Sequence, residues 1–146
     1  MERNERFNAS GCYDPVPYEV MSRIECEERK AAKPAFLPLV YICCPYRNDP
    51  AGNSEKARKF CRFAVDRGYI PLCTILHFPQ FMSDKDPEER ELALFMDIVL
   101  MGKCQEVWVL GETITEGMSR ELHKAERRRQ PVRYFNNDFE EVERHA

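Results

Sequence analysis

Residues 39–44 read LVYICC, an unbroken apolar run that Pro45 closes. A run without alternation of polar and apolar positions is typical of a β-strand buried on both faces, as in a parallel sheet. A helical pattern follows, because apolar residues recur at helical spacing over residues 57–65. We expect Asn53 or Ser54 to cap the start of this helix, since both side chains accept a hydrogen bond from the first turn.

The remainder of the chain continues this alternation. Strands are predicted at residues 69–73, 107–110 and 131–135, and helices at 86–102 and 113–129, the second capped by Thr113 or Thr115, with a short closing helix from Asp138. Pro71 indicates that the second strand lies near a sheet edge or starts late. Asp86-Pro87-x-Glu89 has the residues expected at a helix start. Strands alternating with helices give right-handed βαβ units. We therefore expect an α/β fold: a three-layer Rossmann- or flavodoxin-like domain with a parallel sheet of four or five strands.

The domain organisation changes at residue 37. Residues 1–36 are charged and proline-containing, and they are predicted to form an N-terminal arm or helix, with Tyr18 to Ala31 as its helical part. Residues 37–146 are predicted to form the α/β domain. A chain of 146 residues with 43% hydrophobic and 32% charged residues has the composition of a folded globular protein.

Charge and cysteine content narrow the function classes. A net charge of -3 argues against binding to duplex nucleic acid, which requires a basic face. The seven cysteines include no zinc-spaced group, so we expect reduced core thiols and no metal. The start of the chain has no signal-peptide pattern, and no apolar stretch approaches the roughly 20 residues that span a bilayer. We therefore expect a cytoplasmic protein without a membrane anchor.

Ligands of parallel α/β sheets bind beyond the carboxyl ends of the strands. Tyr46 and Arg47 follow the first strand, where a guanidinium beside backbone N–H groups is suited to hold a phosphate. The alternative is that Arg47 pairs with Asp49 on a surface loop. The loop has neither the GxGxxG spacing of dinucleotide folds nor the GxxxxGK[ST] spacing of a P-loop, so no nicotinamide or nucleoside triphosphate cofactor is expected.

Two carboxyl groups are candidates for chemistry. Glu121 lies on the flank of the helix after the third strand, near the carboxyl end of that strand, where helix N-terminal donors would keep it ionised. Its alternative role is a solvated side chain paired with Lys124. Asp97 is the single charged residue between Leu92 and Gly102, in a helix that is apolar nearly all round. It is either an active-site carboxyl, a structural cap or part of a subunit interface.

A longer motif unites these segments. Thr115, Gly117 and Glu121 stand at the spacing found in nucleoside 2-deoxyribosyltransferases, and Asp97 lies eight positions before Gln105, where the third strand opens. Over residues 38–135 the chain resembles this family and its deoxynucleoside monophosphate N-glycosidase relatives. In the relatives that cleave monophosphates, an aromatic residue and an apolar run precede an arginine, as in residues 41–47.

The resemblance implies site residues and a mechanism. Glu121 would attack C1′ of a nucleoside or nucleoside 5′-monophosphate, Asp97 would protonate or orient the leaving base, and Tyr41 would orient Glu121. Residues that would contact the substrate are Tyr46, Arg47, Thr115, Gly117, His77 and Phe78. The aromatic residues among them either stack on the base or simply cover the core.

Three classes of function remain open at this point. The first is a glycosidase or transferase without a cofactor, with a small-molecule nucleoside or nucleotide as partner. The second is a non-catalytic protein that binds or sequesters a nucleotide or a nucleotide signal. The third is a structural protein in which Asp97 belongs to an interface between copies. In each class the apolar surroundings of Asp97 favour a homo-oligomer, a dimer or larger.

Overall fold

The computed structural model describes Arg23 and residues 35–144. The α/β domain begins at Leu37. The helix predicted from Tyr18 to Ala31 and most of the predicted arm over residues 1–36 lie outside the described residues. In the described part of the chain, no helix is both long enough and apolar enough to cross a bilayer.

A five-stranded sheet forms the centre of the domain. Its strands are β1 (Leu39–Cys43), β2 (Ile70–Leu72), β3 (Glu106–Leu110), β4 (Val132–Phe135) and β5 (Glu141–Val142). They lie in the order β2-β1-β3-β4-β5, with the first four parallel and β5 antiparallel to β4. The edge position of β2 confirms the expectation from Pro71. The mostly parallel sheet confirms the predicted α/β class.

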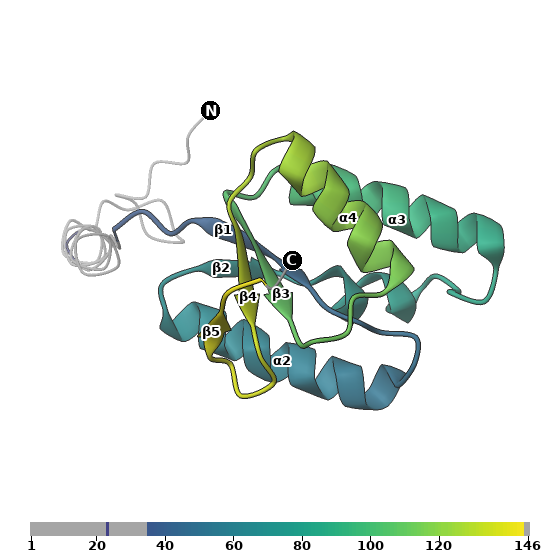
Figure 1. Cartoon of the computed structure of the whole chain (residues 1–146), viewed down its shortest axis with the longest axis horizontal. Helices are drawn as coiled ribbons and strands as arrows, with labels where there is room; N and C mark the ends of the chain where they lie inside the picture. The colour runs from purple at the N-terminus through teal and green to yellow at the C-terminus, as the bar shows by residue number, and fades with distance from the viewer. Residues whose placement is uncertain (1–22, 24–34, 145–146) are drawn as a thin grey trace, which may run out of the picture. The chain divides into compact units, whose positions relative to one another are not determined.

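Helices cover both faces of this sheet. They are α2 (Pro50–Asp66), α3 (Pro87–Met101) and α4 (Glu116–Arg127), with the short 3-10 turns η1 (Thr74–Leu76) and η2 (Phe78–Gln80) between β2 and α3. Figure 1 shows α2 on one side of the sheet and α3 with α4 on the other. Each side has its own core, centred on Phe60 and Trp108 beneath α2 and on Tyr41 and Met101 beneath α3 and α4. The result is the predicted three-layer domain.

The helix starts follow from local side-chain chemistry. α2 begins at Pro50 and not near Asn53, because Asp49 is its N-cap and accepts a hydrogen bond from the Gly52 N–H at 3.2 Å. α3 begins as predicted, with the Asp86 carboxylate accepting from the Glu88 N–H at 3.0 Å. Of the two candidate caps for α4, Thr115 is the one used, since its hydroxyl accepts from the Met118 N–H at 3.2 Å.

The predicted closing helix from Asp138 is wrong, because the chain turns back there to form β5. The Asn136 side chain accepts hydrogen bonds from the backbone N–H groups of Asp138 and Glu140, both at 2.9 Å, and thereby competes with a helical turn. Phe139 takes a left-handed φ of 62°. Its ring packs 5.1 Å from that of Phe60, which secures the hairpin against the core.

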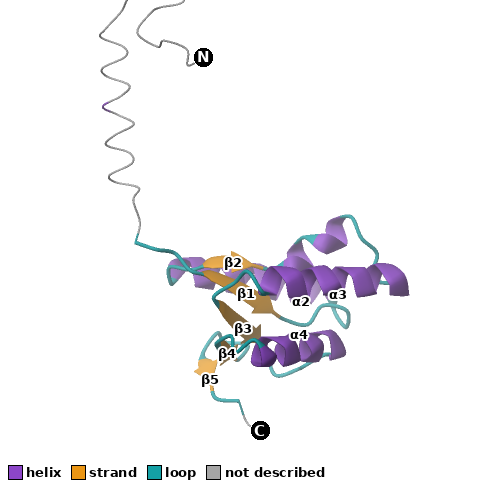
Figure 2. Cartoon of the chain, turned by 90° about the horizontal axis from the view of Figure 1, so that it is seen from above, coloured by secondary structure: helices purple, strands orange, loops and turns teal. Residues whose placement is uncertain are grey.

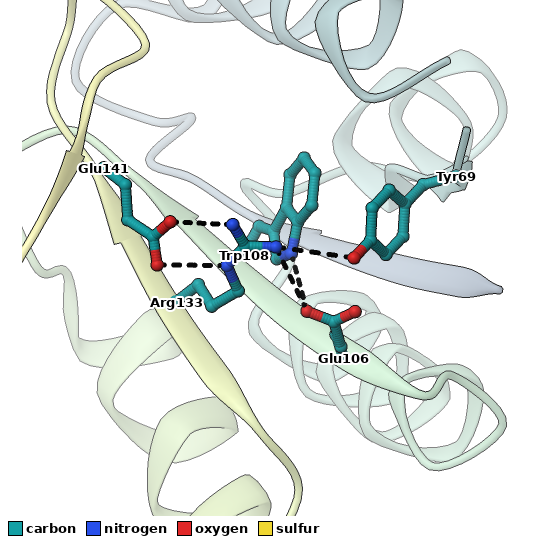
Figure 3. A network of polar contacts seen from close by, with 5 residues as sticks. All are labelled: Tyr69, Glu106, Trp108, Arg133 and Glu141. Carbon is teal, nitrogen blue, oxygen red and sulfur yellow. Dashed lines mark hydrogen bonds and ion pairs between the residues drawn. The ribbon is translucent and has the colours of Figure 1, made fainter. Parts of the chain in front are cut away.

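An arginine fastens β5 to the rest of the sheet (Figure 3). Arg133 on β4 makes a bidentate ion pair with Glu141 on β5, with distances of 3.0 and 2.7 Å. The same guanidinium lies 5.1 Å from the centre of the Trp108 ring and 3.5 Å from the carboxylate of Glu106. Tyr69 closes the network with its hydroxyl at 3.4 Å from Arg133. These side-chain contacts add to the antiparallel pairing of the short β5 strand with β4.

Candidate active site

The strand order fixes where a ligand site is expected. The strand order is β2-β1-β3-β4-β5, so the chain adds β2 on one side of β1 and β3 on the other. In parallel α/β sheets, ligands bind in the crevice beyond the carboxyl ends of the two strands at which the order reverses, here β1 and β3. A cavity of about 230 Å³ lies there, bounded by the loops after β1, β2 and β3 and by α3 and α4. Figure 2 shows α3 and α4 from above, beside the strand ends.

The cavity brings together most of the site residues predicted from the sequence. Those that line it are Tyr46, Arg47, Phe78, Asp97, Thr115, Gly117 and Glu121. Tyr41 does not line it but lies buried in the core behind it, on the sheet face that α3 and α4 cover. His77 is exposed and outside the lining, with its ring 5.2 Å from that of Phe78 and 5.1 Å from that of Phe81.

Glu121 is a buried carboxyl in the second turn of α4, with 8% of its surface exposed. Burial and, to a lesser extent, the charge of Asp97 raise the pKa of Glu121, while hydrogen bonding with Tyr41 and Cys43 lowers it, and the net result is a pKa of about 8. The expectation that Glu121 stays ionised is therefore wrong for the free protein. Desolvation outweighs the hydrogen bonding with Tyr41 and Cys43, and burial therefore favours the neutral acid.

Asp97 enters the cavity from the middle of α3. Burial raises the pKa of Asp97, hydrogen bonding with Thr74 partly offsets the rise, and the net result is a pKa of about 6. Its Oδ1 atom is buried without a hydrogen-bond partner among the described residues. A buried oxygen of this kind is costly, and a ligand that donates a hydrogen bond or accepts a proton would satisfy it.

The two carboxyl groups act electrostatically as a pair. Because the charge of Asp97 raises the pKa of Glu121, the pair releases its protons in two separate steps. Because both pKa values are raised and that of Glu121 is raised more, the pair favours a form with one shared proton near neutral pH. Sites in which one carboxyl is neutral and its neighbour ionised are suited to general acid and nucleophilic chemistry on a single substrate.

Thr74 connects the two carboxyls and was not predicted from the sequence. It is 3% exposed and stands at the start of η1, directly after the second strand. Its Oγ1 lies 3.2 Å from the Tyr41 hydroxyl, and the same side chain interacts with Asp97. The available signal was its place just past the carboxyl end of a strand, where polar residues gather around ligands.

Charged residues surround the mouth of the cavity. Arg47 pairs with Asp84 at 3.6 Å, while Asp49, the partner considered from the sequence, caps α2 instead. Arg120 on α4 makes a bidentate ion pair with Glu91 on α3, at 2.9 and 3.1 Å. Both pairs are partly exposed, so each is weak and exchangeable with a charged ligand.

The inner wall of the cavity is apolar. Its lining includes Ile75, Phe78, Pro79, Ala93, Leu94 and Met118. Apolar walls with a few convergent polar groups are typical of sites for small organic ligands.

The described residues contain no cluster of three or more His, Cys, Asp or Glu side chains arranged to hold a metal. The five cysteines among them are free thiols, of which all but Cys61 are buried.

A second hollow, of about 650 Å³, lies on the other side of α4, against β4 and β5. It is larger, but none of the residues predicted to act on a substrate line it. The smaller cavity is the stronger candidate because it alone, of the two, contains the carboxyl pair.

Comparison with known proteins places the domain in a family. The chain matches none of the curated proteins and none of the solved structures with which it was compared. Residues 38–135 match one family over most of the α/β domain, from the start of β1 to the end of β4. The chain therefore belongs to DUF7768, a family defined by a domain of unknown function.

Proposed function

We propose that this chain cleaves or transfers the N-glycosidic bond of a nucleoside or nucleoside 5′-monophosphate through a covalent glycosyl intermediate on Glu121. The proposal extends the resemblance to nucleoside 2-deoxyribosyltransferases. The observation that carries it is that Glu121 and Asp97, from two different helices, line one small cavity at the carboxyl end of the sheet. Retaining glycosidases use two such carboxyls, one as nucleophile and one as acid and base.

The first step forms the glycosyl ester. A carboxylate oxygen of Glu121 bonds to C1′ while the bond from C1′ to the base nitrogen breaks, and its electron pair leaves with the base. Protonated Asp97 gives its proton to the departing base. Since burial favours the neutral form of Glu121 in the free protein, the productive form arises when the shared proton moves to Asp97.

The second step resolves the ester. The oxygen of a water molecule bonds to C1′ while ionised Asp97 accepts a proton from that water. At the same time the bond from C1′ to Glu121 breaks. A second base in place of water gives transfer instead of hydrolysis. Arg47 and the N-terminus of α4 at Thr115 and Gly117 are suited to the 5′ side of the sugar, and Phe78 to the base.

Base release is the direct test. The full chain is incubated with each nucleoside and 5′-monophosphate, in ribose and 2′-deoxyribose forms, and free base is quantified by chromatography. Glu121→Gln and Asp97→Asn are each expected to reduce release by at least about 1,000-fold, because one removes the nucleophile and the other the acid. Glu126→Gln is the matched control, since Glu126 is exposed on the same helix and pairs with Arg144 outside this cavity.

Covalent trapping tests the intermediate itself. A 2-fluoro-2-deoxy nucleoside slows hydrolysis of the ester, and mass spectrometry of the peptide containing Glu121 should show one added sugar. Absence of the adduct with every base, together with absence of base release, would overturn the enzymatic proposal. Calorimetric binding of the same nucleotides without turnover would then favour a nucleotide-sequestering protein.

A further inference from the structure

Two aromatic side chains stand outside the cavity, directly beside Phe78. The rings of His77 and Phe81 lie 5.2 and 5.9 Å from that of Phe78, which lines the cavity, and 5.1 Å from each other. Phe81 is 61% exposed, and His77 is exposed as well. The aromatic wall of the cavity therefore continues onto the surface, where it is open to a ligand.

The backbone holds Phe81 in place although its ring is exposed. The N–H groups of Phe81 and Met82 donate to the Phe78 carbonyl at 3.1 and 2.9 Å. The Ser83 N–H donates to the Glu89 carboxylate of α3 at 2.6 Å, which fixes the loop to that helix. A ring that is ordered before a ligand arrives loses little freedom on binding, and this suits a stacking surface.

Three arginines line the same cavity, each from a different part of the fold. Arg47 follows β1, Arg90 lies in the first turn of α3, and Arg120 lies on α4. Arg47 and Arg120 are held in partly exposed ion pairs, while Arg90 makes no ion pair with another described residue. Guanidinium groups in such positions exchange a carboxylate for a phosphate at little cost, so the cavity mouth has positive groups for more than one phosphate.

The carboxyl groups of the mouth limit the kind of phosphate that fits. Asp84, Glu91 and Glu116 line the cavity together with the arginines, so the mouth is close to neutral overall. A neutral mouth disfavours the highly charged tail of a nucleoside triphosphate. Bridging phosphates carry a single negative charge each and meet less repulsion there.

The size of the cavity places a second group outside it. At about 230 Å³ it is small, since ligand pockets of roughly 300 to 1,000 Å³ are usual. One nucleoside fills it, so anything joined to the 5′-phosphate lies at the mouth. The loop that carries Phe81 also carries Asp84, which pairs with Arg47, so a base beyond the phosphate is within reach of the exposed ring.

We infer that the substrate is a dinucleotide, joined through the 5′-phosphate of the nucleoside that is cleaved, with its second base stacked on Phe81 and His77. The inference rests on the proposed function for the bond that breaks, and it adds the substrate class. The first base lies on Phe78 inside the cavity, and the bridging phosphate lies among the three arginines. His77, which is outside the cavity lining, thereby contacts the second base.

Binding measurements separate this inference from the catalytic one. Calorimetry on Glu121→Gln, which cannot form the ester, compares the 5′-monophosphates of adenosine, guanosine, cytidine and uridine with symmetric dinucleotides of the same nucleosides, in ribose and 2′-deoxyribose forms. The dinucleotides are joined by a 5′,5′-diphosphate or by a 3′,5′-phosphodiester. At least one should bind about 10-fold or more tightly than its monophosphate, because a second base is stacked. The linkage with the larger gain identifies the source as a diphosphate-linked dinucleotide or the 3′ end of a single strand.

Substitution of the exposed ring tests where the second base lies. Phe81→Ala should bring the ratio of the two dissociation constants close to one, since the stacking surface is lost. The matched control is Phe95→Ala on α3, where Phe95 is 65% exposed and does not line the cavity, and it should keep the original ratio.

The outcomes distinguish the two proposals. Dinucleotides that all bind no more tightly than their monophosphates, or a gain that survives Phe81→Ala, would overturn the dinucleotide inference, and base release from monophosphates by the wild type would still support the proposed function. Tight dinucleotide binding without base release from any substrate would overturn the catalytic proposal and leave a dinucleotide-binding site.

Discussion

The hydroxyl oxygens of Tyr41 and Thr74 lie 3.2 Å apart, and each side chain also interacts with a different carboxyl. Tyr41 interacts with Glu121, and Thr74 interacts with Asp97. The two hydroxyls therefore form a chain between the carboxyl groups, through side chains from β1, η1, α3 and α4. Each hydroxyl lowers the pKa of the carboxyl beside it, so the two hydroxyls together favour the ionised form of both carboxyls.

Thr74→Val should move the acidic limb of the activity profile. In the wild type, base release should be greatest near pH 7, because below about 6 both carboxyls are protonated and above about 8 both are ionised. Removing the Thr74 hydroxyl takes a hydrogen bond from ionised Asp97. The midpoint of the acidic limb should then rise by about one pH unit, measured as kcat/KM against pH, which reports the pKa values of the free protein. Thr74→Ser keeps a hydroxyl and should retain the wild-type limb, whereas an unchanged valine profile would exclude this role.

Tyr41→Phe should move the basic limb of the pH profile of base release. The Tyr41 hydroxyl lowers the pKa of Glu121, so its loss raises that pKa further above 8 and shifts the basic limb upward. The rate should fall about 10- to 100-fold, because Glu121 becomes harder to ionise and loses its orienting group. The ring stays packed in the core, so thermal unfolding should change little. A rate loss with both limbs unmoved would indicate a packing effect alone.

The arrangement of the domain was predictable because it depends on local patterns. The apolar run over residues 39–44 and the Asp86-Pro87 helix start each act through neighbours in sequence, and both predictions are confirmed. The start of α2 was misjudged although Asp49-Pro50 has the same chemistry as Asp86-Pro87. The nearby Gly52 favoured a loop over a first helical turn. The hairpin at Asn136 depends on a side-chain cap that propensity alone does not identify.

The site was predictable in part, for a related reason. Asp97 was identifiable because a single carboxyl in an apolar helix is unusual, and Glu121 because it stands at the motif spacing from Thr115 and Gly117. Thr74 was not, since its role arises from contacts with a strand and a helix that are distant in sequence. The protonation of Glu121 also depended on the tertiary fold. Its burial beside Asp97 determines the direction of the pKa, and helix position alone predicted the opposite.

Substitutions at the cavity mouth should separate phosphorylated from unphosphorylated substrates. Arg47→Gln should lower kcat/KM for nucleoside 5′-monophosphates about 10- to 100-fold and leave nucleosides unaffected, because it removes a charge-assisted contact to the phosphate. Asp84→Asn should raise kcat/KM for nucleoside 5′-monophosphates a few-fold, since it releases Arg47 from its 3.6 Å ion pair. The ratio of kcat/KM values for matched substrates is the measurement. Equal losses on both substrates would place Arg47 away from the phosphate.

Glu121→Gln should stabilise the domain at alkaline pH. The pKa of Glu121 is raised from 4.5 to about 8, so the native state binds more protons than the unfolded state between these values. The free energy of unfolding of the wild type therefore falls as pH rises through this window, and an amide escapes that loss.

The advantage of Glu121→Gln should be small near pH 5 and reach on the order of 3 kcal/mol at pH 8, measured by urea unfolding at both values. Glu126→Gln should follow the wild-type dependence, because Glu126 is exposed. If the Glu121→Gln and wild-type curves stay parallel from pH 5 to pH 8, Glu121 does not carry the burial cost on which its proposed reactivity depends. If the two curves diverge as pH rises, the burial that raises the pKa of Glu121 also lowers the stability of the domain, as its proposed reactivity requires.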